Sequence, residues 1–336
     1  MNGPSKTARA FVYRAGVRIA GTVVACDAAA GSDLVFLSHA AVLGARRRRA
    51  LPRLGGGRRQ VLTTDLTLAL LGPFGDRLRA QALVAPYGRP FALGDLRLEL
   101  YPSGHLPGAA SLLCERDGRR VTYAGPIGEQ AELRTADALC LDARFAARDV
   151  AFPTRTAAEE ALRGLAHERS AGGAPVFFVD PPALAPQVAR ALAATGVRLR
   201  AARAILEAIA AFRRAEPSLP ALVVQRYAGR LADDEVLLWP GEARPPALTG
   251  AAQARSLIIV TPRAVGTAAG APAARVLAFP VGGDLPTLVR YVEASGAGEV
   301  ALCGAPDEAL ADALRTRGRS VYRLGPPRQI DLFGAG

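Results

Sequence analysis

The stretch Asp33-Leu-Val-Phe-Leu-Ser-His39-Ala-Ala-Val-Leu-Gly44 decides which fold and function this chain is expected to have. Its apolar run predicts a buried strand that carries Ser38 and His39 to the strand end. A metal site in such a place would continue with further histidine and aspartate residues. Instead, the next five residues have side chains that cannot bind a metal, and a run of arginines follows. The stretch is typical of a hydrolase scaffold that has lost catalytic side chains and kept a basic surface.

The arginines after this stretch form a dense cluster. Seven of them lie within fourteen residues, at Arg46, Arg47, Arg48, Arg49, Arg53, Arg58 and Arg59. The chain carries a net charge of +12, and a composition rich in arginine, alanine, glycine and proline accounts for the total but not for the clustering. Such a cluster favours a polyanion such as nucleic acid, with an affinity that falls as salt rises. The alternative is a solvated loop.

Composition restricts the class of protein. Half of the 336 residues are apolar, which predicts a well-buried core rather than disorder. No apolar run is as long as a membrane span, and the first residues lack the apolar core of a signal peptide, so we expect a cytoplasmic protein without a membrane partner. The cysteines are scattered through apolar runs, which predicts buried thiols: Cys26, Cys114, Cys140 and Cys303.

Residues 9–142 have the pattern of short strands with glycine turns, and one helix is expected over residues 66–71, capped by Thr64 or Asp65. From residue 142 on, helices and strands alternate, which predicts a mostly parallel sheet covered by helices. A capping box of Thr156 and Glu159 predicts a helix over residues 156–168. Later helices are expected at 183–195, 201–214, 285–295 and 307–317, and strands at 175–179, 221–224, 235–239, 256–260, 299–303 and 320–324.

Six blocks carry a likeness to a known family, namely residues 26–39, 101–111, 120–127, 136–145, 279–288 and 299–305. In this order they resemble the motifs of the metallo-β-lactamase fold and, within it, of the β-CASP nucleases. The likeness is greatest to DNA ligase-associated 3′ exonucleases and mRNA 3′-end processing factors. Ser38-His39 is similar to the start of the family's "SHxHxDH" box, and residues 101–111 are similar to its "PAGHxxGSA" motif.

The resemblance implies a two-zinc site whose metal-bound hydroxide attacks a phosphodiester, and this chain lacks most of its ligands. His39 and His105 match two ligands of the same metal. Residues that cannot bind metal match the other ligand positions: Ala41, Leu43, Gly44, Pro126, Gly282 and Gly304. The carboxylates retained near the matched positions are those of Asp27, Asp142 and Asp284. In the family, the counterpart of Asp27 mainly orients the histidine box.

Two imidazoles make a poor zinc site, because stable sites supply three or four protein ligands. We therefore expect no zinc, and interpret His39 and His105 as side chains that hydrogen-bond strand-end backbone. A carboxylate added to the pair would give a single-metal site, which remains the alternative. A nucleophilic pair of Ser38 and His39 is rejected, because neighbouring residues on a strand point to opposite faces.

The chain ends in a second motif, Gln329-Ile330-Asp331-Leu332-Phe333. It resembles the pentapeptide with which bacterial repair and replication proteins bind the DNA sliding clamp. Leu332 and Phe333 would fill an apolar pocket while Gln329 hydrogen-bonds at its rim. The alternative is a tail that folds back and buries Leu332 and Phe333 on its own domain.

Together these features predict an α/β protein, a metallo-β-lactamase αββα sandwich from residues 1–150 and 270–336. A β-CASP α/β domain would be inserted at 150–270, and residues 326–336 would form the tail. The expected function is that of a catalytically degenerate exonuclease-like protein that binds nucleic acid, with DNA favoured over RNA. It would act in DNA repair with partners such as the sliding clamp or DNA ligase. Two alternatives stay open: a residual 3′ exonuclease or phosphodiesterase with one metal, and a non-catalytic scaffold for other proteins.

Overall fold

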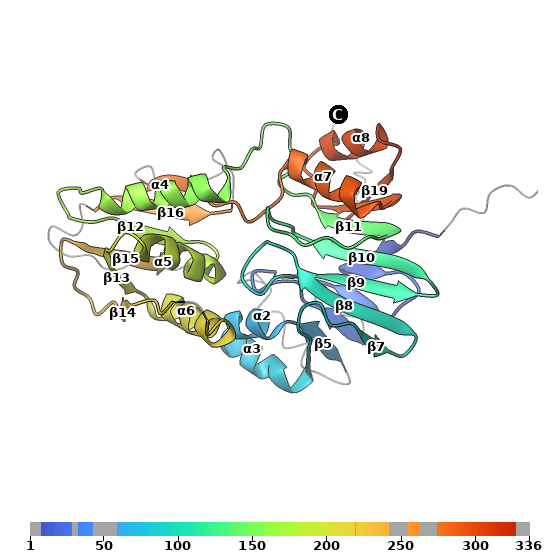
Figure 1. Cartoon of the computed structure of the whole chain (residues 1–336), viewed down its shortest axis with the longest axis horizontal. Helices are drawn as coiled ribbons and strands as arrows, with labels where there is room; N and C mark the ends of the chain where they lie inside the picture. Colours follow the sequence, from blue (N-terminus) through green and yellow to red (C-terminus); the bar gives the residue numbers. More distant parts are fainter. Residues whose placement is uncertain are drawn as a thin grey trace, which may run out of the picture.

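The computed structural model describes residues 8–28, 33–42, 59–218, 220–241, 255–262 and 274–326. In these ranges the chain is an α/β protein with three sheets. Two of the sheets lie together on the right of Figure 1, and the third lies on the left. The general α/β class expected from the sequence is therefore confirmed. No helix in the described ranges is long and apolar enough to cross a membrane.

The first sheet follows the sequence order of its strands. These are β1 (Phe11–Tyr13), β2 (Val17–Ile19), β3 (Val24–Cys26), β4 (Leu34–Phe36), β5 (Gln60–Thr63) and β6 (Ala82–Val84). Where the sequence predicts one helix, the structure has α2 (Asp65–Leu70) and α3 (Pro73–Leu78), then a 3₁₀ turn at Arg79–Gln81. Gly72 separates the two helices with φ +60°, and Pro73 begins the second, a position where its missing N–H has no cost.

The second sheet has the order β19-β18-β11-β10-β9-β8-β7. Its strands are β7 (Phe91–Leu93), β8 (Leu96–Pro102), β9 (Ala110–Arg116), β10 (Arg119–Gly125), β11 (Ala138–Asp142), β18 (Glu299–Cys303) and β19 (Ser320–Leu324). The first and second sheets share one apolar core, which includes Phe11, Phe36 and Leu98. The four cysteines are free thiols; Cys26, Cys114 and Cys140 are buried in this core, as predicted, and Cys303 packs against it half-buried.

Helices cover the outer faces of these two sheets. On the second sheet, α7 (Leu285–Ser295) and α8 (Ala309–Arg315) bury apolar residues against β11 and β18. On the first sheet, α2 and α3 pack against Val35 and Val61. The order of layers is therefore helix, sheet, sheet, helix.

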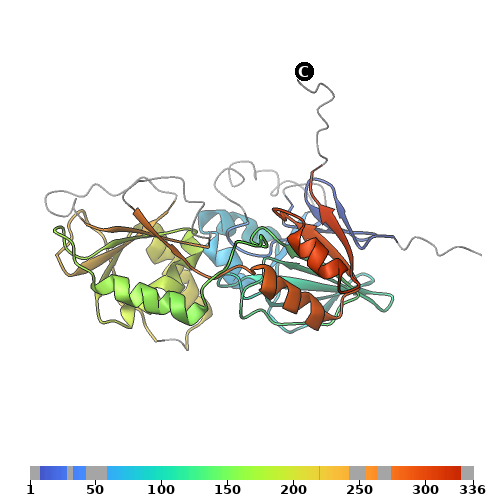
Figure 2. The same cartoon turned by 90° about the horizontal axis from the view of Figure 1, so that it is seen from above.

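The third sheet is parallel throughout, as expected from the alternation of helices and strands. Its strands are β12 (Val176–Val179), β13 (Arg198–Ala201), β14 (Val224–Arg226), β15 (Glu235–Pro240), β16 (Leu257–Thr261) and β17 (Ala274–Ala278). Three helices lie on one side of it in Figure 2: α4 (Arg155–His167), α5 (Ala185–Ala193), preceded by a 3₁₀ turn at Pro182–Leu184, and α6 (Arg203–Ala215).

Two details differ from the expectation. From the sequence, the chain is expected to return to the first domain at residue 270, whereas in the structure β17 still pairs with β16 in the third sheet. Helix α4 begins earlier than expected because its N-cap is Thr154, not Thr156. Glu159 does not close the predicted capping box, because its carboxylate bonds Arg155 at 2.8 Å, one turn earlier on the helix.

The two parts of the molecule meet through helices. Helix α2 packs against α6, and one apolar cluster runs from Val35 and Leu68 to Phe177 and Val260 of the third sheet. The chain crosses between the parts twice, after β11 and again through residues 279–284. The ends of β5, β6 and β8 therefore face helices α5 and α6 across a cleft.

Candidate functional site

Asp27 anchors a buried hydrogen-bond network at the end of β3. It has φ 49°, a left-handed conformation that aspartate tolerates better than most residues. Its carboxylate accepts the backbone N–H of Ser38 at 2.8 Å, the Ser38 hydroxyl at 2.6 Å and the Tyr123 hydroxyl at 2.8 Å. Burial raises the pKa of Asp27, and the hydrogen bonds from Ser38 and Tyr123 act in the opposite direction. The role expected for Asp27, holding the histidine segment in place, matches these contacts.

Ser38 and His39 do pair, contrary to the expectation. Their Oγ and Nδ1 atoms lie 2.7 Å apart. The argument from strand alternation is wrong here because β4 ends at Phe36, so both residues lie beyond the strand. The arrangement is still not a nucleophilic triad. The Ser38 hydroxyl donates to Asp27 rather than to the imidazole, so Nδ1 of His39 is the donor and Nε2 is unprotonated in the neutral ring.

His105 lies between β8 and β9 and meets His39. Its Nδ1 contacts the carbonyl oxygen of Val281, which can only accept, so this ring also leaves Nε2 unprotonated when neutral. The ring centroids of His39 and His105 are 4.6 Å apart, with an interplanar angle of 89°. The two side chains are 4% and 7% exposed. The structure therefore brings together the two histidines that the sequence singled out.

Both imidazoles are held neutral. Burial lowers the pKa of His39 well below its ordinary value of 6.5, and the charges of His105 and Arg144 lower it further. Burial lowers the pKa of His105 to about 4, although its hydrogen bond to Val281 acts in the opposite direction. The pair therefore offers two neutral rings at pH 7.

The carboxylate of Asp142, at the end of β11, is bound by the side chain of Arg144. The Arg144 Nε lies 3.0 and 2.9 Å from the two carboxylate oxygens, and Nη2 bonds one of them as well. The Arg144 side chain is 59% exposed. A guanidinium is thus the positive charge beside the histidine pair, and Asp142 has a partner already.

Asp284 acts as a helix cap. It is the N-cap of α7, where its side chain accepts the backbone N–H of Thr287 at 3.1 Å. Its other oxygen accepts the N–H of Phe152 at 3.5 Å, which fastens the segment before α4. This carboxylate therefore has a structural role at the crossing between the two parts of the molecule.

The residues present do not fit a two-zinc site. Ala41, Pro126 and Gly304 offer no side-chain donor, and a Cβ at Gly282 would lie 2.7 Å from the ring of Phe145. Among the residues that the structure describes, no group of three or more histidine, cysteine or acidic side chains could hold a metal ion. Leu43 and Gly44 lie outside that set.

Most of the predicted binding residues belong to parts of the chain outside the described ranges. Arg46, Arg47, Arg48, Arg49, Arg53 and Arg58 lie outside the described residues, as do Gln329, Ile330, Asp331, Leu332 and Phe333. Of the seven clustered arginines, only Arg59 is described, directly before β5.

Two members of the site were not singled out from the sequence. Tyr123 lies in the 120–127 block and Arg144 in the 136–145 block, and the sequence alone gives neither residue a role. Arg144 follows Asp142 by two residues, a spacing that allows a pair across a turn. Tyr123 carried a weaker signal, because only its contact with Asp27 distinguishes it from an ordinary core tyrosine.

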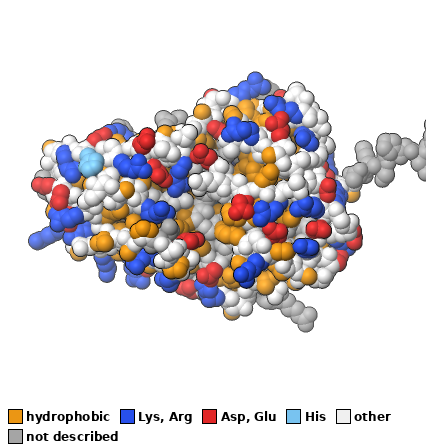
Figure 3. Space-filling view, in the orientation of Figure 1, with side chains coloured by type: hydrophobic (Ala, Val, Ile, Leu, Met, Phe, Trp, Pro, Cys, Tyr) orange, Lys and Arg blue, Asp and Glu red, His pale blue; other side chains and the backbone are white. Residues whose placement is uncertain are grey.

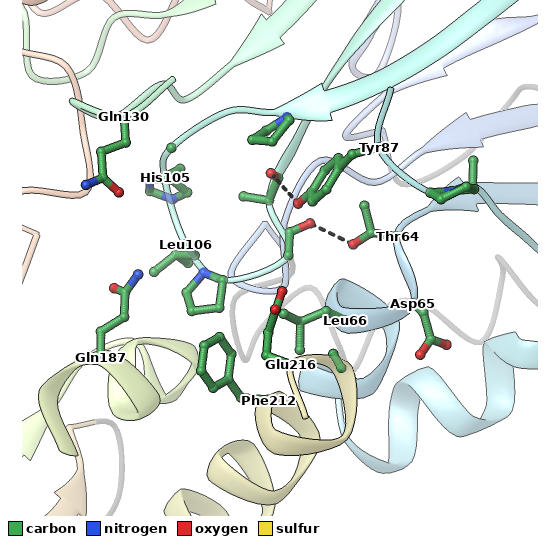
Figure 4. Close-up of a pocket in the computed structure, with 18 of the residues that line it drawn as sticks. Thr64, Asp65, Leu66, Tyr87, His105, Leu106, Gln130, Gln187, Phe212 and Glu216 are labelled. Atoms are coloured by element: carbon green, nitrogen blue, oxygen red, sulfur yellow. Dashed lines mark hydrogen bonds between the residues drawn. The ribbon is translucent and has the colours of Figure 1, made fainter. Parts of the chain in front are cut away.

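A cleft opens beside His105, between the first sheet and the helices of the third (Figure 4). One wall is the loop 104–109. The carbonyl of Gly108 accepts the hydroxyls of Thr64 at 2.6 Å and Thr67 at 2.7 Å. A side chain at Gly108 would collide with the backbone of α2, because a Cβ there would lie 2.7 Å from the Thr67 nitrogen. The glycine therefore allows a close, fixed approach of loop to helix.

Comparison with known proteins indicates a fold for this chain and does not indicate an activity. No protein-family model and no curated protein matches this chain. Among solved structures, a protein of unknown function from Enterococcus faecalis V583 is similar, with a TM-score of 0.58 and 15% sequence identity. The match covers 88% of this chain and 79% of the other. At this identity the likeness concerns the fold alone.

Proposed function

We propose that this chain is a catalytically degenerate relative of the β-CASP nucleases that binds nucleic acid, DNA in the first place, and acts in DNA repair. The observation that carries the proposal is the meeting of His39 and His105 in a site whose other matched positions hold no ligands. His39 and His105 are both buried, and each imidazole is fixed through its Nδ1. A side chain that only fills a core does not require its ring to be oriented in this way, whereas a metal ligand does.

The order of layers supports the finer assignment of the fold. Two facing sheets with helices outside correspond to the αββα sandwich of the metallo-β-lactamase fold. The third sheet with its helices enters between β11 and β18, where the β-CASP domain would be inserted. Residues 143–278 would then form the insertion.

The arginine cluster supports nucleic acid as the ligand. On the face in Figure 3, the described arginines are interspersed with acidic side chains, and many are paired, such as Arg198 with Asp234 and Arg317 with Glu293. The seven arginines between residues 46 and 59 have no acidic residue among them in the sequence. They are therefore the strongest local source of positive charge for binding phosphates.

Replacing Arg46, Arg47, Arg48 and Arg49 by alanine should weaken DNA binding and reduce its salt dependence. If all four bind phosphates, the slope of log affinity against log salt should become less steep by about 3. Fluorescence anisotropy with a labelled oligonucleotide over a series of salt concentrations measures both effects. The matched control replaces four paired arginines by alanine, at Arg198, Arg203, Arg275 and Arg317, and should change the slope much less. An equal loss in both variants, or no DNA binding by the unmodified chain, contradicts the proposal.

The enzyme alternative is tested separately. Stoichiometric zinc in the purified protein, with nuclease activity that a His39→Ala/His105→Ala variant loses, would establish a working single-metal site in place of the degenerate one. DNA binding without hydrolysis in the same assay supports our proposal. Failure to bind DNA, with capture of repair proteins, would favour the scaffold.

Recruitment to the sliding clamp is a further part of the proposal, based on residues 329–333. Immobilised bacterial clamp should retain the full chain and release a chain in which Leu332 and Phe333 are replaced by alanine, because these side chains would fill the clamp pocket. A Gly334→Ala variant, just outside the motif, is the control. Equal retention of all three proteins would exclude this mode of docking.

A further inference from the structure

The cleft beside His105 has the size of a small-molecule site. Its volume is about 590 Å³, within the range of ligand pockets in proteins. One side is formed by the loop 104–109 and by residues at the ends of β5 and β6, and the other by α5 and the end of α6. The loop is fixed across the cleft wall, because the Tyr87 hydroxyl donates to the carbonyl of Ala109 at 2.9 Å. A ligand would therefore enter a formed site and lose little binding energy to ordering the protein.

The free charge in this cleft is negative, although the whole chain carries a net charge of +12. The charged side chains that line it are those of Asp65, Arg155 and Glu216. Arg155 is bound to Glu159 at 2.8 Å, and Asp65 is bound by Arg79 at 3.0 Å. Within the described part of the chain, the carboxylate of Glu216 has no hydrogen-bond or ion-pair partner. The cleft therefore favours a cationic ligand.

The position of Glu216 at a helix end adds to this negative charge. Glu216 is the C-cap of α6, a helix of 13 residues, and its backbone N–H bonds the Phe212 carbonyl at 2.9 Å. The last carbonyl groups of a helix carry partial negative charge. Arg213 and Arg214, in the last turn, do not line the cleft. Figure 4 shows Glu216 reaching from the end of α6 toward the loop that carries Leu106.

Two aromatic rings line the cleft together with this carboxylate. Phe212 lies one helical turn before Glu216, on the same side of α6, and its ring is partly exposed. Tyr87 of the opposite wall is 38% exposed. Burial raises the pKa of Tyr87, and the charge of Glu216 raises it further, which indicates that the carboxylate is close to this ring. The face of an aromatic ring attracts a cation, so the rings and the carboxylate favour the same kind of ligand.

The rest of the lining favours an aliphatic chain on that cation. Leu66, Leu106 and Ala109 form an apolar wall along the cleft. Each methylene group that a ligand buries on this wall would add to its affinity. His105 is neutral and leaves its Nε2 unprotonated, an acceptor that suits an amine and does not suit a phosphate or a carboxylate.

We propose that this cleft binds a small aliphatic amine, whose primary ammonium group pairs with the carboxylate of Glu216. The ammonium group lies against the rings of Phe212 and Tyr87, and the alkyl chain lies along Leu66 and Leu106. The inference goes beyond the proposed function and does not depend on it. It uses none of the clustered arginines, and it assigns to the cleft a ligand with a charge opposite to that of nucleic acid.

Pentylamine and 1-pentanol, which share one chain and differ in the ammonium group, test this inference on the full-length protein. At pH 7 the amine is a cation and the alcohol is neutral. Titration followed by ligand-detected NMR should show pentylamine bound about tenfold more tightly. In Glu216→Gln, pentylamine should fall to the level of pentanol, whose own affinity stays the same. In Phe212→Leu, which keeps an apolar contact for the chain, pentylamine should weaken about threefold and pentanol should not.

Glu160→Gln is the matched control, because it removes an exposed carboxylate on α4 with the same change in net charge. This variant should bind both ligands as the unmodified protein does. Thermal unfolding establishes that each variant is folded. Equal binding of the two ligands to the unmodified protein, or an equal loss of pentylamine binding in Glu216→Gln and Glu160→Gln, overturns the inference.

A lysine side chain of another protein carries the same ammonium group. N-acetyl-lysine methylamide should bind more weakly than pentylamine, because its two amide groups would lose water in an apolar cleft. Tighter binding of this compound would assign the site to a protein partner and overturn the assignment to a small amine. If DNA binds through the arginines while pentylamine does not bind, the proposed function stands and the amine site fails. If pentylamine binds as expected while DNA does not, the amine site stands and the proposed function fails.

Discussion

Replacing Asp27 by alanine should lower the free energy of unfolding by about 3–5 kcal/mol, because one substitution leaves three hydrogen-bond donors without their acceptor. The carboxylate accepts three hydrogen bonds, two from Ser38 and one from Tyr123. Without it, buried donors lose their acceptor, each at a cost of about 1–3 kcal/mol. Denaturation by urea, followed by circular dichroism, measures the change. Asp27→Asn should fall between the two proteins, since it keeps one acceptor oxygen and adds a donor facing other donors.

Asp284→Ala is the comparison, because this carboxylate came from the same family resemblance. Asp284 is half-buried and caps α7, so its loss should cost about 1 kcal/mol. If the two variants lose equal stability, Asp27 is not the anchor that its contacts indicate. The comparison also tests whether the retained carboxylates are remnants of chemistry or parts of the scaffold, since scaffold residues affect stability whether or not a metal binds.

Element types were predictable where local signals agreed. The helix expected at 285–295 and the strands expected at 299–303 and 320–324 match α7, β18 and β19. In α7, a capping aspartate, a proline in the first turn and a C-terminal glycine with φ 73° all indicate the same boundaries. The start of α4 was ambiguous because two threonines stand close together, and only the backbone decides which one caps the helix.

Helix α3 was missed for a related reason. The helix expected from the sequence ends at residue 71, directly before Gly72 and Pro73, although proline is well suited to the first position of a helix. The amphipathic stretch that follows is only six residues long, too short to show a period. Tertiary packing of Phe74 and Leu78 into the apolar core, rather than local propensity, stabilises this helix.

The site was predictable in part, and the limit is again physical. Sequence order placed His39 and His105 at strand ends, and the ends of neighbouring strands meet. It could not place Gln187 and Phe212 in the cleft beside His105, because these two residues come from helices that the fold brings across the cleft. Sequence order also could not show that the Arg144 guanidinium pairs with the Asp142 carboxylate, since an arginine that follows an aspartate has many possible partners.

The histidine pair should make the protein less stable as pH falls. Burial lowers the pKa of His105 from 6.5 to about 4 in the folded chain, so between these values the unfolded state binds more protons than the folded one. Stability therefore rises with pH in this window and is lost on acidification. For His105 alone the loss from pH 7 to pH 5 should be about 2 kcal/mol. His39 contributes with the same sign, and Asp27, whose pKa is raised, contributes with the opposite sign.

The variant His105→Asn isolates the effect of His105. An asparagine amide N–H can replace Nδ1–H as donor to the Val281 carbonyl, and it does not titrate. Urea denaturation at a series of pH values should show a shallower loss of stability below pH 6.5 for this variant than for the unmodified protein. His167→Asn, which changes an exposed histidine on α4, is the matched control. Parallel curves for His105→Asn and the unmodified protein would falsify the neutral, buried state of this imidazole.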